Sequence, residues 1–144
     1  MSLNEKLASL KIDVTKPPKA VGSYVAYKII NKFIYISGQL PFKSDGSLIK
    51  GKVGQDINLV DAQNAARFCC INVLAQLNQA CGGNLNLVKN CIKITGYVNS
   101  TDTFVEQPKV INPISELLVE IFGDRGKHSR VAVSVNSLPL GVPL

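Results

Sequence analysis

Two long segments of the 144-residue chain repeat apolar residues every three or four positions, which is the period of one helix face. The first begins after Asn58, a residue type that caps helices well, and it ends at Gly82-Gly83. Its apolar repeat consists of Val60, Ala65, Cys69, Val73, Leu77 and Ala80. We therefore predict that a long helix, the longest element of the chain, lies between these two signals.

The second helical segment runs from about Phe104 or Ile111 to Phe122, where Gly123 ends it. Because proline lacks a backbone N–H, Pro113 is compatible with this helix only near its start. A shorter repeat of leucines within residues 1–19 predicts an N-terminal helical extension that ends before two prolines.

Alternation of apolar and polar residues predicts strands elsewhere, and two β-rich runs around Asn31-Lys32 predict a hairpin. In residues 92–99 the apolar face holds Ile92, Ile94, Gly96 and Val98. In residues 130–136 three valines alternate with Arg130, Ala132, Ser134 and Asn136. We expect the valines to pack against the helices and Arg130 to lie on the opposite face. A final strand should begin after Leu138-Pro139.

The order of these elements is two strands, a loop or short strand, a helix, a strand, a helix and two strands. This order predicts one α+β domain over residues 1–144, with a mixed, mostly antiparallel sheet and both long helices on one face. The opposite face of the sheet would be uncovered in a monomer. We therefore expect a homo-oligomer in which another copy covers it.

Composition narrows the classes of function. Apolar residues make up 46% and charged residues 18%, as in globular proteins. The net charge is +6, but the lysines are scattered and not interleaved with aromatic residues, so a nucleic-acid partner is not favoured. Charges interrupt the first apolar positions and no apolar run reaches the length of a membrane span. We expect neither a secretory signal nor a membrane partner.

The four cysteines, at positions 69, 70, 81 and 91, form no CxxC pair, and His128 is the sole histidine. This pattern offers no metal-ligand set. Packing in the core is the favoured interpretation of the cysteines. Because unpaired thiols indicate a reducing compartment, we expect a cytoplasmic protein.

Arg130 is the main candidate for chemistry. A guanidinium is always charged, and its planar fork of donors matches a carboxylate. Two interpretations are open: Arg130 holds a small anion, or it forms a structural ion pair with an acidic side chain. His128, two residues earlier, is either an acid–base group or a solvated loop residue.

Several motifs carry a family resemblance. In chain order they are "VGSY" (21–24), "YISGQLP" (35–41), "DAQNAARFCCINVLAQL" (61–77), "VINPISELLVEIFG" (110–123), and "SRVAV" followed by "LPLGVP". From about Ala20 onward the chain resembles the RidA family, also called the YjgF or L-PSP endoribonuclease family. Its longer loop and its "HSRVAV" form resemble a divergent subgroup. The resemblance implies a chorismate-mutase-like fold and a homotrimer with a central barrel and clefts between subunits.

The resemblance also implies a RidA-type deaminase. Such an enzyme hydrolyses reactive 2-iminobutanoate and 2-iminopropanoate to 2-oxo acids and ammonia, without a cofactor or metal. Its ligands are small 2-imino and 2-oxo carboxylates. Arg130 and Tyr24 match catalytic positions, and Arg130 also matches the arginine that grips the substrate carboxylate. The other substrate-binding positions are Ser37, Gly38, Gln39, Asn112 and Ala132.

The chain departs from the family pattern at several positions. Ala132 stands where the archetype has a cysteine, and Gly22-Ser23-Tyr24 where it has Gly-Pro-Tyr. The family's water-orienting glutamate would fall just beyond Leu144. Two other functions therefore stay open: a non-catalytic trimer that binds small carboxylate metabolites, and an endoribonuclease, which the family's other name suggests.

Overall fold

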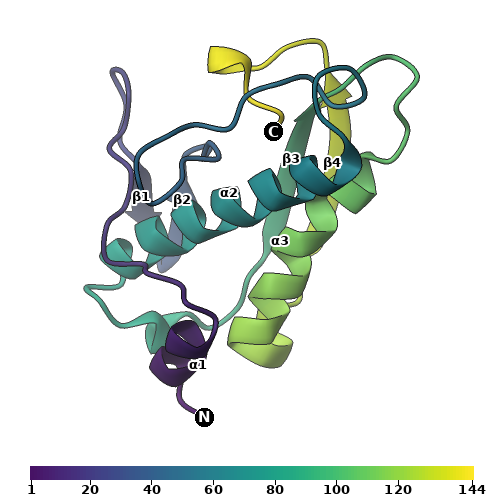
Figure 1. Cartoon of the computed structure of the whole chain (residues 1–144). Helices are drawn as coiled ribbons and strands as arrows, with labels where there is room; N and C mark the ends of the chain where they lie inside the picture. The colour runs from purple at the N-terminus through teal and green to yellow at the C-terminus, as the bar shows by residue number, and fades with distance from the viewer.

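The computed structural model describes residues 1–144, and its longest element is helix α2 (Leu59–Ala80). The Asn58 side chain accepts a hydrogen bond from the Asp61 backbone N–H at 2.9 Å, so the predicted cap is confirmed. The helix ends where Gly82 and Gly83 adopt left-handed backbone angles, with φ of 62° and 86°. Figure 1 shows α2 crossing the middle of the molecule.

Helix α2 is buried along a face of mostly small residues. The buried apolar members are Ala62, Ala65, Ala66, Cys69, Cys70, Leu74, Ala75 and Leu77. Val60, which the apolar repeat includes, is instead 69% exposed, because the buried face begins two residues later at Ala62. Short side chains on this face allow the neighbouring helix to approach α2 closely.

Helix α3 (Gln107–Phe122) packs on α2, and it begins and ends within the predicted limits. Pro113 lies inside the helix, so the expectation that this proline sits near the start is wrong. Proline cannot donate the hydrogen bond that the Lys109 carbonyl would accept in a regular helix. The Gln63 side chain of α2 donates to that carbonyl instead, at 2.9 Å. A bond between the two helices thus replaces the one lost within α3.

Strands β1 (Tyr27–Ile30) and β2 (Phe33–Ile36) pair antiparallel, with Ile30 opposite Phe33. Asn31 and Lys32 between them have positive φ angles of 48° and 68°, as a two-residue type I′ turn requires. The predicted hairpin is confirmed.

Strands β3 (Lys93–Asn99) and β4 (Ser129–Val135) pair in parallel, and α3 connects them. No ladder joins this pair to the β1–β2 hairpin, and the two pairs lie toward different ends of α2 (Figure 1). The α+β class is therefore confirmed, whereas the prediction of one mostly antiparallel sheet is wrong. The second pair is parallel because its connection crosses over through a helix.

The register of β3 and β4 decides which face of β4 meets the helices. Arg130 lies opposite Ile94, and Ala132 lies opposite Gly96. Paired residues share a sheet face, and Gly96 is buried against Ile111 of α3. Arg130 and Ala132 therefore face α3 and the valines of β4 face away from it. The predicted faces of this strand are wrong, because the helix approaches too closely for valines on its side.

The shorter helices are α1 (Leu3–Ser9) and three 3-10 turns, η1 (Leu85–Leu87), η2 (Gly123–Gly126) and η3 (Pro139–Gly141). Helix α1 lies within the predicted N-terminal extension, and two of its leucines enter the core. No helix has both the length and the apolar character that crossing a lipid bilayer demands.

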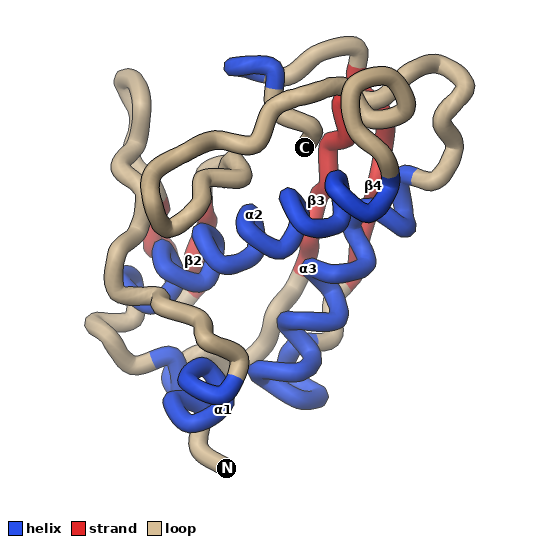
Figure 2. The backbone as a smooth tube through the Cα atoms, viewed as in Figure 1, coloured by secondary structure: helices blue, strands red, loops and turns tan.

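The last residues do not form the predicted final strand. Turn η3 contains Leu140 with a positive φ of 59°, and this bend interrupts an extended path. The chain then returns to the core, where Leu144 is buried and the Asn99 backbone N–H donates to the Pro143 carbonyl at 2.8 Å. Figure 2 shows this segment as a short helical turn followed by coil.

The four cysteines are free thiols. Cys69 and Cys70 are buried within α2, so the core interpretation is confirmed for them, and burial raises the pKa of both thiols, that of Cys70 to about 12. Cys81 and Cys91 are only partly buried, at the end of α2 and before β3.

Replacement of Gln63 by alanine should lower the free energy of unfolding by about 0.5–1 kcal/mol, because the Lys109 carbonyl loses its donor. Replacement of Pro113 by alanine returns a backbone N–H to the helix. In that background, replacement of Gln63 should lower the free energy of unfolding much less. Denaturant unfolding of the parent, both single variants and the double variant measures this coupling. Equal costs in the two backgrounds would contradict the proposed exchange of hydrogen bonds.

A thiol reagent such as Ellman's reagent should modify Cys81 first and leave Cys69 and Cys70 unmodified in the folded protein. Reaction requires an accessible thiolate, and burial suppresses both access and ionisation at the two α2 positions. Peptide mass spectrometry after brief labelling identifies the modified residues, with denatured protein as the control for full reaction. Early labelling of Cys70 would show that α2 is less well packed than described.

Candidate functional site

Arg130 lies on β4 with its guanidinium against the first half of α3. Its Nη1 donates to Asn112 Oδ1 at 3.0 Å and to Ser115 Oγ at 3.1 Å. Its Nη2 points at the Pro108 carbonyl at 3.5 Å, the outer limit of a hydrogen bond. The structure therefore brings together Arg130 and Asn112, which we predicted from the sequence to belong to one site.

No carboxylate pairs with Arg130. The salt bridges of the chain are Lys109 with Glu106 and Lys127 with Asp124, and every acceptor of Arg130 is a neutral oxygen. A structural ion pair within the chain, one of the two interpretations of Arg130, is thus wrong. The positive charge of the guanidinium is left without a partner of opposite sign.

The hydrogen bonds of Arg130 also define which edge of the guanidinium is available. Asn112 and Ser115 use the two hydrogens of Nη1. The Nε–H has no acceptor within the chain, and Nη2 has one hydrogen that is not directed at Pro108. Nε and Nη2 together form one edge of the guanidinium fork, which can receive both oxygens of a carboxylate.

His128 belongs to the same cluster through Ser115. Its Nδ1 lies 2.7 Å from the Gly126 carbonyl, and its Nε2 lies 2.8 Å from Ser115 Oγ. Because a carbonyl only accepts, Nδ1 carries the hydrogen, and Nε2 of the neutral ring accepts from the Ser115 hydroxyl. His128 is therefore a half-buried, hydrogen-bonded residue, and the interpretation of a solvated loop residue is wrong.

Ser115 is a member of the cluster that the sequence analysis missed. It follows Asn112 by three residues on α3, so the two side chains share one face of the helix. This spacing could have identified Ser115 once Asn112 was placed beside Arg130. The Gly126 carbonyl had no comparable signal, because any residue supplies a backbone oxygen.

The other predicted site residues form a second group beside the β1–β2 hairpin. Ser37 Oγ donates to the Val25 carbonyl at 2.6 Å, and Gln39 Nε2 donates to the Ser37 carbonyl at 3.0 Å. The Tyr24 hydroxyl lies 3.4 Å from the Val21 backbone N–H, and its side chain is 52% exposed. Gly38 between Ser37 and Gln39 is exposed.

The two groups do not meet within one chain. No hydrogen bond connects the Tyr24–Gln39 segment to the Arg130 cluster, and β2 and β4 lie apart in Figure 1. Ala132 lies on the same face as Arg130, but its methyl group packs against the core and offers no polar contact. The predicted site residues therefore lie in two separate groups.

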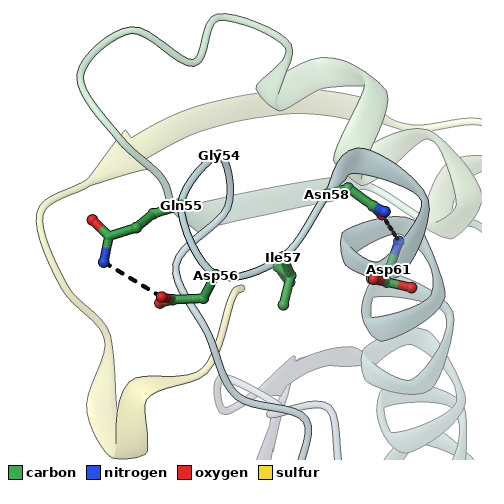
Figure 3. Close-up of a pocket in the computed structure, with 6 residues that line it drawn as sticks. All are labelled: Gly54, Gln55, Asp56, Ile57, Asn58 and Asp61. Carbon is green, nitrogen blue, oxygen red and sulfur yellow. Dashed lines mark hydrogen bonds between the residues drawn. The ribbon is translucent and has the colours of Figure 1, made fainter.

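Two surface pockets lie at the start of α2 and along α3, and Arg130 lines neither of them. The first, of about 410 Å³, lies beside the start of α2. Figure 3 shows the residues that line it: Gly54, Gln55, Asp56, Ile57, Asn58 and Asp61. The Asp56 carboxylate there accepts from the Lys52 backbone N–H at 2.8 Å and so serves the turn. A second, open hollow lies along the outer side of α3 and shares only Ser115 with the cluster. The structure contains no group of three metal-ligating side chains.

Comparisons with known proteins agree with this architecture. Residues 4–142 match the family described as "YjgF/chorismate mutase-like, putative endoribonuclease". Protein TCP17 of Trypanosoma cruzi is 34% identical over 98% of this chain and 87% of its own length. Atu1372 of Agrobacterium tumefaciens, a protein of unknown function, has a TM-score of 0.88 at 37% identity, with 98% of this chain and 85% of the other covered. A Shewanella oneidensis protein described as a "putative endoribonuclease" has a TM-score of 0.93 at 31% identity, with 99% and 94% covered.

Proposed function

The chain belongs to the YjgF/chorismate mutase-like family, as its motifs predicted, and from this membership together with the Arg130 cluster we propose that it is a RidA-type deaminase. It hydrolyses 2-iminobutanoate and 2-iminopropanoate to the corresponding 2-oxo acids and ammonia. Arg130 binds the substrate carboxylate, and Asn112 holds the guanidinium in place.

The observation that carries this proposal is the unpaired charge of Arg130 with one open edge. A half-buried guanidinium that has only neutral acceptors favours an anion beside it. Two charge-assisted hydrogen bonds to a carboxylate contribute about 1.5–3 kcal/mol each. A small acid on this edge is held in one orientation.

Imine hydrolysis demands little beyond such positioning. The imine carbon is already electrophilic, so the site has to fix the carboxylate, present one face to water and give a proton path to the departing amine. The hydroxyl of the half-exposed Tyr24 supplies a polar group that can present water and pass on the proton, and the backbone around Ser37, Gly38 and Gln39 lines the cleft. None of these steps uses a cofactor or a metal.

The two halves of the site come together between subunits in this proposal. Both strand pairs leave apolar residues exposed: Phe33 is 50% and Tyr35 62% exposed on β2, and Tyr97 is 53% and Val133 40% exposed on β3 and β4. Monomers rarely leave such faces in water, so a second copy is the simplest cover. We propose a homotrimer with a central barrel, in which Arg130 of one subunit faces Tyr24 of the next. The free thiols support a reducing, cytoplasmic location.

Two alternatives have observations behind them. The same open arginine edge suits a non-catalytic trimer that binds small carboxylate metabolites. An endoribonuclease is favoured by the description of the matched family and of the Shewanella relative. In that case the scattered lysines would contact phosphates, and RNA cleavage would fall steeply with salt.

Replacement of Arg130 by alanine should lower kcat/KM for 2-iminobutanoate by roughly two to four orders of magnitude, because two charge-assisted hydrogen bonds are lost. The substrate is generated with a threonine dehydratase, and 2-oxobutanoate and ammonia are measured as products. Lysine at position 130 retains the charge but not the fork, so it should recover only part of the activity.

Arg67 of α2 provides a matched control, since its replacement by alanine removes the same charge outside the Arg130 cluster. Parent protein that releases ammonia no faster than buffer would reject the deaminase. If 2-oxobutanoate nevertheless raises the melting temperature of the parent protein, the non-catalytic binding trimer becomes the favoured function. Cleavage of single-stranded RNA by the parent, lost at high salt, would favour the endoribonuclease instead.

Mixed oligomers test whether the site lies between subunits. Tyr24→Ala and Arg130→Ala homo-oligomers should both be inactive. Co-expressed, differently tagged subunits should regain activity, since roughly a quarter of the interfaces in a random mixture pair two intact halves. Purification over both tags followed by the ammonia assay measures this recovery. Absence of activity in mixed trimers of confirmed composition would place both residues in one subunit's site.

A further inference from the structure

A chain of four hydrogen-bonded groups lies behind the guanidinium of Arg130. It runs from the Gly126 carbonyl to His128, from His128 to Ser115, and from Ser115 to Arg130, at 2.7, 2.8 and 3.1 Å. The family resemblance gives a role to Arg130 only, which is the last of the four groups. The residues at the other end have no role in the proposed binding of substrate.

The first of the four hydrogen-bonded groups, the Gly126 carbonyl, is held rigidly. Gly126 is buried, and a side chain at this position would collide with the Leu118 carbonyl of α3, so glycine allows the turn to lie directly on the helix. Backbone hydrogen bonds pin both sides of the turn, from Cys91 N–H to the Arg125 carbonyl and from Ser129 N–H to the Ile92 carbonyl. The Gly126 oxygen therefore has a fixed position relative to α3.

The Gly126 carbonyl decides which group donates in each of these hydrogen bonds. It can only accept, so Nδ1 of His128 donates and Nε2 of the neutral ring presents a lone pair. The Ser115 hydroxyl donates to that lone pair, which turns the lone pairs of Oγ toward Arg130. Without His128 the hydroxyl could rotate and direct its own hydrogen at the guanidinium.

We propose that Ser115 and His128 are positioning residues that hold the Nη1 side of Arg130 against α3 and leave the Nε–Nη2 edge facing outward for the carboxylate. The inference rests on the proposed binding of a carboxylate by Arg130 and adds the residues that prepare it. A long arginine side chain loses considerable rotational freedom when it binds a ligand. Anchoring one side of the guanidinium beforehand removes part of that cost from the binding step.

Carboxylate binding in a slightly alkaline buffer tests the proposal, with 2-oxobutanoate as the probe and calorimetry as the measurement. Ser115→Ala removes one of the two acceptors of Arg130 Nη1, and His128→Ala frees the Ser115 hydroxyl to rotate. Each should weaken binding about five- to tenfold, a partial loss because Asn112 remains bonded to Nη1. His128→Gln offers an amide oxygen to Ser115 and an N–H to Gly126, so it should bind within about twofold of the parent.

The outcomes separate this inference from the proposed function. If Arg130→Ala abolishes binding while Ser115→Ala and His128→Ala bind like the parent, the positioning role is wrong and the carboxylate site stands. If His128→Gln is as weak as His128→Ala and both melt at a lower temperature, the histidine supports the fold only and the inference also fails. If Arg130→Ala binds like the parent, the carboxylate site itself is wrong. The ammonia assay on the same variants should show the loss in KM rather than in kcat.

Discussion

The close approach of α3 to β3 at Gly96 is the contact on which the rest of the structure depends. A Cβ at this position would lie 2.5 Å from Ile111 Cδ1 and 2.6 Å from its Cγ1, so glycine lets the helix lie at its observed distance from the strands without a shift of Ile111. Asn112 follows Ile111 directly, and Ser115 lies one turn further along. The same contact therefore sets the distance of both oxygens from Arg130, and the packing of the core and the geometry of the site depend on each other.

Elements with local causes were predictable from the sequence. Asn58 caps α2 through its own side chain, and Asn31 and Lys32 form the turn of the hairpin with their own backbone angles. The inward face of β4 was not predictable in this way. It depends on the register between two strands that α3 separates and on a glycine in the partner strand. Valine is the more common core residue, but here the inward position requires the small side chain of Ala132.

The candidate site shows the same division. The chemistry of its guanidinium singled out Arg130, and the resemblance to a family added Asn112, which the structure joins to Arg130 by a hydrogen bond. The resemblance also grouped them with Tyr24 and Ser37, which the structure places beside the other strand pair. Sequence motifs carry the residue types of a site, but they do not record the distance between those residues in the folded chain. Residues that one family pattern groups together can therefore lie apart, as Tyr24 and Arg130 do here.

The outward valines of β4 have a consequence for the energetics of the whole protein. If a neighbouring copy covers them, part of the apolar burial that stabilises the fold is intermolecular, and mass action then applies to folding itself. Dilution would weaken the individual domain as well as the assembly, and the thermal midpoint would rise with protein concentration. The arrangement of side chains around Arg130 would then depend in part on the protein concentration, because concentration sets how much of the protein is assembled.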